Sequence, residues 1–139
     1  MDTPAAGALH LVVVTPEKAV LDQTAEAITL PMYDGELGVR PGRAALVGQL
    51  GPGELRFTAG GVTTRYFVDG GFAQVRANTV TVLTGSAKKA TDIKPDDLTK
   101  ETEKAAALPA TNGVERASKQ RAQQRATAMN KVAAKVTSA

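Results

Sequence analysis

Short apolar runs alternate with turn-forming residues through the first 87 residues of the chain. Residues 9–14 form a β-branched apolar run that ends at Thr15-Pro16, and residues 54–58 alternate apolar with polar positions. Alternation is the pattern of a half-buried strand, because successive side chains point to opposite faces of a sheet. Gly60-Gly61 follows the second run, where a hairpin turn belongs. Repeated along the segment, the pattern predicts about eight to ten short strands in an antiparallel sandwich or flattened barrel.

Four further strands are predicted from the same signals. Pro31 ends a run over residues 24–30, and the Val and Thr content of residues 79–83 suits a strand. Two more runs, 62–68 and 72–76, are separated by Asp69-Gly70-Gly71, which predicts a turn between them. A sandwich over residues 9–87 follows. Residues 1–8 lack the basic start and apolar block of a signal peptide and are predicted to be a disordered leader.

The hydrophobic period changes after residue 87. Leu98, Ala105 and Leu108 recur at helical spacing, and Pro95 stands where a first helical turn tolerates proline. Residues 88–139 are predicted to form a two-helix hairpin, with helices at about 95–108 and 114–136. The expected apolar stripe of the second helix is Val114, Ala117, Ala122, Ala126, Met129, Ala133 and Val136. Alanine favours helix but buries little area, so we expect the hairpin to open at low cost.

Residues 33–47 join two apolar runs and contain Gly35, Gly38, Pro41 and Gly42. Glycine tolerates positive φ and proline fixes φ, so the stretch predicts a shaped turn region rather than a loose linker. A structured exposed loop on a strand scaffold is a common contact site. The alternative interpretation is a plain connection between two strands without a partner.

Charge is distributed unevenly between the two segments. Residues 1–87 contain 6 Lys/Arg against 8 Asp/Glu, a net of −2, and residues 88–139 contain 11 against 6, a net of +5. A basic helical tail is a candidate for binding nucleic acid. However, no aromatic residue follows Phe72 to stack on bases, so a solvated or partner-facing surface is predicted and nucleic acid is not.

The composition leaves little material for catalysis or metal binding. The 139 residues include no Cys and one His, which excludes disulfides, thiolate metal sites and Cys/His nucleophiles. His10 lies in an apolar strand run, where a sheet-face or edge histidine is expected rather than a proton-transfer group. No run of 18 apolar residues is present, so no insertion into a membrane is predicted. A binding function is predicted in place of an enzyme.

Four passages make the chain similar to a known family. Residues 9–17, 50–56 and 66–83 resemble its strands and turns. Residues 35–46 read Gly-Glu-Leu-Gly-Val-Arg-Pro-Gly-Arg-Ala-Ala-Leu and resemble its Gly-Glu-Leu-Gly-x-x-Pro-Gly-His-Ala-Pro-Leu motif. On these passages the chain resembles the epsilon subunit of bacterial F-type ATP synthases, which corresponds to the mitochondrial delta subunit. The likeness covers about residues 9–87. Arg43 stands where the family usually has His, so a role that depends on that His has no matching residue in this chain.

The resemblance implies both a fold and a function. The fold is an N-terminal β-sandwich of about ten strands with a C-terminal helical hairpin. The function is that of a non-catalytic central-stalk (rotor) subunit, which binds the gamma subunit and the c-ring and couples rotation to ATP synthesis in a proton-translocating ATP synthase. Its implied location is peripheral, on the cytoplasmic face of the cell inner membrane. In many bacteria the hairpin extends into the catalytic head and inhibits ATP hydrolysis.

The resemblance also implies two sets of contact residues. The loop facing the c-ring comprises Asp34, Gly35, Glu36, Leu37, Gly38 and Arg43. The basic helix that contacts the alpha and beta subunits of the head presents Arg116, Lys119, Arg121 and Arg125.

Some members of the family bind ATP on the folded hairpin through an Asp-x-x-Arg-Ala pattern and a later Arg. Here the matching residues 112–117 place Gly113 where the Asp should be. No cofactor is therefore expected, with Arg121 and Arg125 as the residues that a nucleotide would contact.

The residues also suit a second class of protein, a free-standing β-sandwich binding module with a basic helical tail for dimerisation or polyanions. Stoichiometric binding to a gamma-type coiled-coil partner separates the two hypotheses, because the free-standing module does not predict it.

Overall fold

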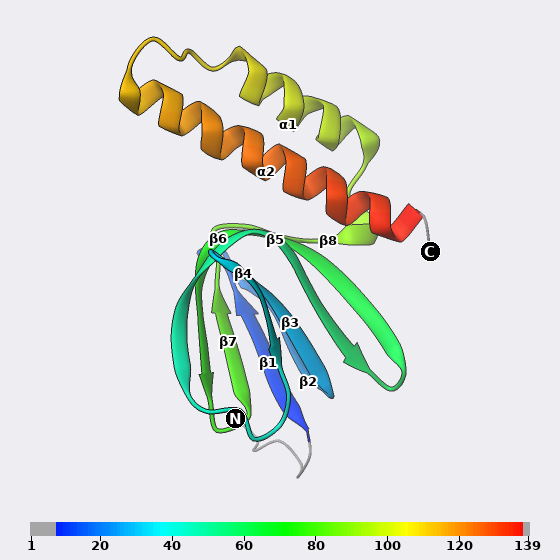
Figure 1. Ribbon diagram of the computed structural model, residues 1–139. Helices are drawn as coiled ribbons and strands as arrows, with labels where there is room; N and C mark the ends of the chain where they lie inside the picture. Colours follow the sequence, from blue (N-terminus) through cyan, green and yellow to red (C-terminus); the bar gives the residue numbers. More distant parts are fainter. Residues whose placement is uncertain (1–7, 138–139) are drawn as a thin grey trace.

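The structure, a computed structural model, describes residues 8–137, with side chains described as far as Lys135. This part of the chain contains eight strands, one short 3-10 helix and two α-helices. The predicted order of a β-sandwich followed by a helical hairpin is confirmed (Figure 1). The elements are β1 (Leu9–Val14), β2 (Ala19–Ala25), β3 (Ala27–Met32), β4 (Gly35–Val39), β5 (Leu46–Ala59), β6 (Val62–Arg76), β7 (Thr79–Leu83), β8 (Ala87–Lys89), η1 (Ala90–Asp92), α1 (Pro95–Ala107) and α2 (Gly113–Thr137). Of the predicted leader, residues 1–7 lie outside the described range.

The strands follow one hydrogen-bonded path in the order β2-β1-β7-β6-β5-β3-β4, and β8 pairs with β6 beside that path. Neighbours are antiparallel except β1 and β7, which are parallel. The alternating residues Leu9, Leu11 and Val13 of β1 are fully buried in the sandwich core. The predicted strand over residues 9–14 thus buries every second residue, with the residues between them half-buried.

Strand β6 corrects the predicted turn at residues 69–71. It continues through Gly70 (φ 72°) and Gly71 (φ 105°) while staying paired with β5, from Leu46 opposite Val75 to Ala59 opposite Val62. The glycines bend the strand instead of reversing it. Because β5 and β6 are single long strands of 14 and 15 residues, the described chain has eight strands, within the eight to ten predicted from the pattern and below the ten implied by the resemblance.

Pro31 lies inside β3 and does not end it as the sequence suggested. It pairs with Glu36 of β4, and on its other side the register between β3 and β5 shifts between Thr29 and Met32. The missing N–H of proline thus falls at an irregularity of the ladder, where a strand tolerates it. The predicted strand over residues 24–30 is broken at Glu26, whose N–H donates to the carbonyl of Thr58 at 2.8 Å.

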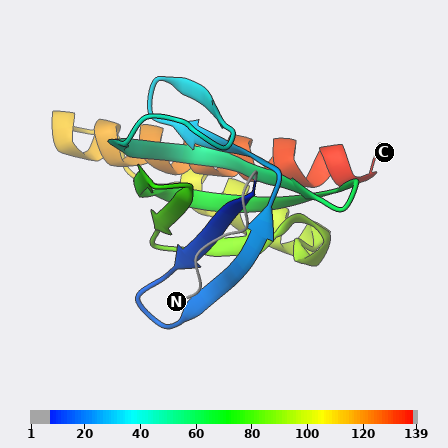
Figure 2. The same cartoon turned by 90° about the horizontal axis from the view of Figure 1, so that it is seen from below.

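The hairpin lies across one end of the sandwich, with α2 between the strands and α1 (Figure 1). Seen from below, α2 runs across the whole width of the sandwich (Figure 2). Pro95 opens α1, and Asp97 accepts a hydrogen bond from the N–H of Lys94 at 3.1 Å. Asn112 caps α2 by accepting the N–H of Glu115 at 2.9 Å. Both helix starts therefore use local side-chain caps.

A second, smaller core forms where α2 meets the sandwich. Its buried residues are Phe67, Ala90, Ile93, Met129 and Val132. The predicted stripe of α2 was right at Ala122, Ala126 and Met129, which are buried, and it missed Val132.

Two further stripe residues, Val114 and Ala117, are exposed. The N-terminal end of α2 extends away from the sandwich, so its first turns meet no strand (Figure 1). The side chain of Val136, also assigned to the stripe, lies outside the described ones.

Candidate functional site

The stretch predicted as one turn region is two turns separated by strand β4. Tyr33 and Asp34 form the tight turn after β3, and Glu36, Leu37 and Gly38 lie on β4. The assignment of these three residues to a loop is therefore wrong.

Arg43 lies beyond the opposite end of β4, in the second turn, where its N–H donates to the carbonyl of Arg40 at 3.3 Å. Gly42 of the same turn donates its N–H to Asn78 Oδ1 at 2.8 Å. The structure thus brings residues 34–38 together and separates Arg43 from them.

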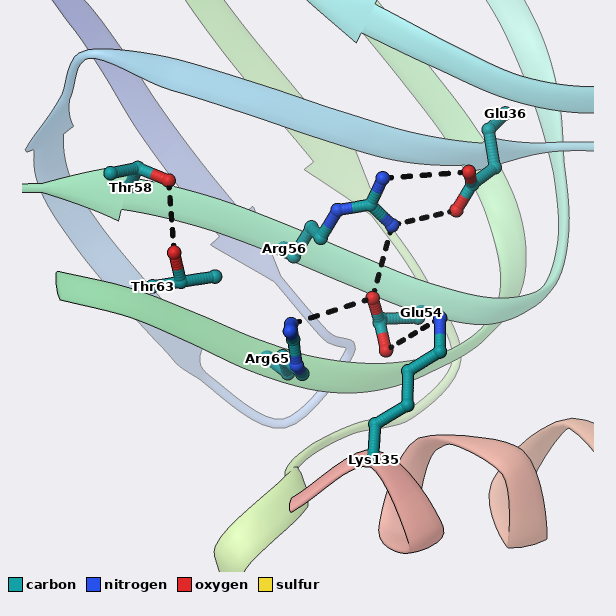
Figure 3. Close-up of polar contacts among 7 residues, drawn as sticks. All are labelled: Glu36, Glu54, Arg56, Thr58, Thr63, Arg65 and Lys135. Carbon is teal, nitrogen blue, oxygen red and sulfur yellow. Dashed lines mark hydrogen bonds and ion pairs between the residues drawn. The ribbon is translucent and has the colours of Figure 1, made fainter. Parts of the chain in front are cut away.

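Glu36 belongs to a cluster of five charged residues, which we call the Glu54 cluster (Figure 3). Its members are Glu36, Glu54, Arg56, Arg65 and Lys135. Arg56 Nη1 lies 2.8 Å from Glu36 Oε2 and 3.1 Å from Glu54 Oε1. Lys135 Nζ lies 3.4 Å from the other oxygen of Glu54. The cluster therefore joins β4, β5, β6 and the C-terminal end of α2.

Glu54 is the most deeply buried charge of this cluster, with only 6% of its side chain exposed. A buried carboxylate is tolerated when cations compensate for its lost hydration. Arg56 and Lys135 provide this compensation, and Arg65 Nη1 adds a third positive charge at 3.9 Å. Among the described residues Glu54 Oε2 accepts no hydrogen bond, so the charge of Lys135 is what faces that oxygen.

Arg56 sets the electrostatics of Glu36. The hydrogen bond from its guanidinium holds the pKa of the Glu36 carboxyl below its ordinary value, and Lys135 adds a weaker attraction. In return, the same hydrogen bond raises the pKa of Arg56. The pair with Arg56 therefore favours the ionised form of Glu36, whose side chain is 55% exposed.

An open groove of about 920 Å³ lies beside the cluster, between the bend of β3 and β5 and one face of α2. Met32, Tyr33 and Pro52 line the sandwich wall, and Gln124 and Lys131 line the helix wall. Gly53 faces Pro31 so closely that an added Cβ would lie 2.8 Å from the proline Cβ. A side chain at position 53 would therefore have to displace Pro31 from the groove wall.

The four basic residues assigned to the head-contacting helix differ in their surroundings. Arg116 and Arg121 are exposed, and Lys119 is half-buried. Arg121 Nη2 donates to Ser118 Oγ at 3.2 Å. Arg125 is held by Asp69 of β6 at 3.3 Å and lies 3.9 Å from Glu101 of α1. In this conformation Arg125 is held by carboxylates of β6 and α1, whereas the hydrogen bond of Arg121 stays within its own helix.

An apolar area on the outer face of the sandwich was not predicted from the sequence. Phe72 of β6 and Leu83 of β7 are direct cross-strand partners and are 56% and 54% exposed. Val47 of β5 lies on the same face, two residues from the partner of Phe72, and is 72% exposed. The signal was present in the alternation: Ala73 and Val82 point inward, so Phe72 and Leu83 must point outward.

His10 forms a hydrogen bond with Asp22 across β1 and β2, and no other side-chain hydrogen bond of His10 occurs among the described residues. Within residues 8–137 no group of three His, Cys, Asp or Glu side chains is placed to hold a metal ion. Neither helix of that range is long and apolar enough to cross a bilayer.

Comparison with known proteins identifies the fold. Residues 8–90 match the family described as ATP synthase, Delta/Epsilon chain, beta-sandwich domain, a range that covers strands β1 to β8. The chain belongs to this family. An epsilon chain is a non-catalytic subunit of ATP synthase, so the prediction that the chain is not an enzyme agrees with its family.

Bacterial epsilon chains are similar to this chain over most of its length. The ATP synthase epsilon chain of Rhodopirellula baltica is 48% identical over 103 residues, which is 74% of this chain and 80% of that one. The epsilon chain of Nitratidesulfovibrio vulgaris is 45% identical over 85 residues, 61% of this chain and 63% of that one. Both relatives thus match this chain over more than half of its length.

Solved structures extend the likeness to the hairpin. A chain of the Euglena gracilis mitochondrial ATP synthase, solved with OSCP, F1 and c-ring, superposes with a TM-score of 0.78 over 94% of this chain and 83% of that one, at 27% identity. A chain of the Tetrahymena thermophila mitochondrial central stalk and c-ring gives 0.73 over 95% and 99%, at 16% identity, which supports the fold alone. An epsilon-type fold thus accounts for the sandwich and for the docked helices together.

Proposed function

We propose that the chain is a rotor subunit of the ATP synthase central stalk, which binds the gamma subunit and the c-ring and couples rotation to ATP synthesis. The observation that supports this most directly is the superposition of 94% of the chain, hairpin included, on a chain of an ATP synthase assembly. Its place is then peripheral, on the cytoplasmic face of the inner membrane, and held there by the complex.

The outer face around Phe72, Leu83 and Val47 is the surface we assign to the gamma subunit. These three side chains form an exposed apolar area on one face of β5, β6 and β7. Exposed apolar areas on a soluble domain commonly mark contact sites for another protein. Polar Gln49 and Gln74 lie beside them on the same face, which suits the mixed character of a subunit interface.

The end of the sandwich formed by Asp34, Gly35 and Glu36 is the surface we assign to the c-ring. Asp34 and Glu36 are exposed carboxylates at the β3–β4 turn, and Glu36 is oriented by Arg56. Arg43, at the other end of β4, is left out of this assignment because the strand separates it from the turn.

The hairpin is the part we assign to the catalytic head, through the exposed Arg116 and Arg121 together with Lys119. Extension of the hairpin toward the alpha and beta subunits would inhibit ATP hydrolysis. The docked state buries little apolar side chain on α2 beyond Met129 and Val132, which supports release at low cost.

The gamma assignment is tested by measuring binding of the full chain to purified cognate gamma subunit by calorimetry. Phe72→Ser with Leu83→Ser is expected to weaken binding by more than about tenfold, the usual effect of removing buried anchors. Val62→Ser is the matched control, because Val62 is 65% exposed but lies at the β5–β6 turn. Failure of the unaltered chain to bind gamma would refute the rotor proposal and favour the free-standing module.

The head assignment is tested on ATP hydrolysis by the cognate catalytic head lacking this subunit. The full chain is expected to inhibit, and a chain that ends after Lys94 is expected to bind gamma without inhibiting. This end point keeps β8 and Ile93, which pack on Phe67, whereas a cut after Ala87 would remove them. Equal binding without inhibition by either form would leave a coupling subunit whose tail does not regulate the head.

A further inference from the structure

The Glu54 cluster connects two parts of the molecule that the proposed function assigns to different partners. Glu36 lies at the end of the sandwich assigned to the c-ring, and Lys135 lies near the C-terminus of α2. Arg56 and Glu54 stand between them, so ion pairs run from Glu36 to Arg56, to Glu54 and to Lys135 (Figure 3). A change of charge at Glu36 therefore alters the electrostatic attraction that acts on Lys135.

Arg56 is shared between the two carboxylates. The same nitrogen, Nη1, lies 2.8 Å from Glu36 and 3.1 Å from Glu54, and Nη2 lies 3.5 Å from the second oxygen of Glu36. When Glu36 is neutralised or paired with an external cation, Arg56 is free to turn wholly to Glu54. Arg56 then neutralises more of the negative charge of Glu54, so the attraction between Glu54 and Lys135 weakens.

The charge balance of the cluster also indicates that neutralising Glu36 weakens the attraction that holds Lys135. Two carboxylates face the three cations Arg56, Arg65 and Lys135. Without the charge of Glu36, one buried carboxylate must hold all three, and Lys135 is the only one of them on a separate, docked element. The repulsion is relieved most easily by movement of α2.

The docked position of α2 depends on few contacts, which makes it sensitive to such a change. On α2 the second core uses Met129 and Val132, with Ala128 and Ala133 beside them. The ion pairs of Arg125 and Lys135 add the charged contacts between α2 and the sandwich. Weakening one ion pair is therefore enough to change the equilibrium between docked and undocked α2 by a few-fold.

We propose that the Glu54 cluster is a charge relay by which a cationic partner group at Glu36 loosens the docking of α2 through Lys135. The inference rests on the proposed function only in taking Glu36 to face a partner. By reciprocity, release of α2 makes Glu36 a better site for such a cation. The relay thus links contact at one end of the sandwich to the freedom of the hairpin.

The relay is tested by amide hydrogen exchange along α2 in the isolated full chain. Lys135→Met is expected to speed exchange over the docked part of α2 by about tenfold, because it removes the one cationic partner of the buried Glu54 carboxylate that lies on α2. Glu36→Gln is expected to speed the same amides by about threefold, the scale of a partly exposed ion pair. In the Lys135→Met background Glu36→Gln is expected to have no further effect on α2.

Two substitutions that remove the same charges as the test variants, one cation and one carboxylate, serve as controls. Lys131→Met removes a cation one turn before Lys135, and Lys131 has no ion pair among the described residues. Asp34→Asn removes an exposed carboxylate two residues before Glu36. Asp34 also has no ion pair among the described residues. Both are expected to leave α2 exchange within about twofold of the unaltered chain. Amides of β1 and β7, away from the cluster, report whether any variant destabilises the whole sandwich.

The relay is refuted if Glu36→Gln matches Asp34→Asn, or if its effect persists without Lys135. A uniform gain in exchange across β1, β7 and α2 would also refute it, because the effect would then be loss of stability rather than loss of docking. Failure of the chain to bind a c-ring in a separate assay would refute the proposed partner and leave the relay intact. The two proposals can thus fail independently.

Discussion

Arg125 of α2 lies 3.3 Å from Asp69 of β6, so a residue that the family resemblance assigns to the catalytic head holds the hairpin to the sandwich. Glu101 of α1 lies 3.9 Å from the same guanidinium, which ties the two helices to each other as well. Under the proposed function, a head contact of Arg125 would therefore require release from Asp69 and Glu101. Its role depends on whether the hairpin is docked or extended.

Arg125→Met is expected to weaken docking of the hairpin without unfolding the sandwich. The side chain is 37% exposed, so solvent screening limits the loss to below about 1 kcal/mol. Exchange of α2 amides should rise a few-fold at low salt and less at 1 M salt, where the ion pair is already screened. Arg121→Met is the control, because Arg121 donates its hydrogen bond to Ser118 on its own helix. An equal effect of both substitutions at all salt concentrations would contradict the role given to Asp69.

Gly71→Ala is expected to destabilise the sandwich severely. Gly71 has φ 105°, and an added Cβ would lie 1.9 Å from the carbonyl oxygen of Leu83, a backbone atom that has no room to move. Backbone strain and overpacking together should cost more than about 3 kcal/mol in the free energy of unfolding. The measurement is urea unfolding followed by circular dichroism.

Gly60→Ala is the matched control for Gly71. Gly60 has φ 58°, and an added Cβ there meets no atom within 4 Å. Only the conformational cost of a left-handed residue is left, about 1 kcal/mol. A cost at Gly71 no larger than at Gly60 would show that β6 relaxes around the new methyl group.

Parts of β1, β3, β5, β6 and β7 were predictable from the sequence in position but not in continuity, whereas β4 was predicted to be part of a turn region. Asp69-Gly70-Gly71 has the composition of a turn, and only pairing with β5 keeps β6 extended through it. Pro31 likewise has the composition of a strand end, and β3 accepts it because the register with β5 shifts there. In both places a long-range contact decided between two conformations that the local sequence permits.

The Glu54 cluster was beyond the reach of the sequence for a related reason. Its ion pairs join residues 36, 54, 56 and 135, and no local pattern relates these positions. Alternation did mark Leu55 and Phe57 as inward-facing on β5, which leaves Glu54 and Arg56 on the other side of the strand. It did not indicate that α2 covers that side and buries Glu54. The assignment of Glu36 to a contact surface, by contrast, came from its motif.

Phe67→Ala is expected to release the hairpin more than it destabilises the sandwich. Phe67 is 1% exposed and packs in the second core with Met129 and Val132. Removing a buried Phe side chain costs about 3–5 kcal/mol when the surroundings cannot adjust. Here α2 can undock, so the effect should appear mainly as fast amide exchange in α2.

Phe72→Ala distinguishes the two faces of β6. Phe72 is 56% exposed on the outer face, so its removal should change the free energy of unfolding by less than about 0.5 kcal/mol. The same substitution should weaken binding to gamma, which Phe67→Ala should leave nearly unchanged. The reverse pattern would mean that the partner binds the surface beneath α2.

The stability contributed by Glu36 is expected to disappear in acid. Arg56 lowers the pKa of Glu36 from its ordinary value of 4.5, so this carboxylate stabilises the folded state at a pH above 4.5. The contribution is lost as the pH falls through the lowered pKa. Because 55% of the side chain is exposed, this contribution should amount to less than about 1 kcal/mol.

In urea unfolding, the free-energy gap between the unaltered chain and Glu36→Gln should therefore be largest at pH 7 and close as the pH falls below 4. Asp34→Asn, which removes an exposed carboxylate outside the Arg56 pair, is the matched control in the same measurement. A gap for Glu36→Gln that stays constant from pH 7 into acid would mean that Glu36 acts through its shape and hydrogen bonding, and not through its charge.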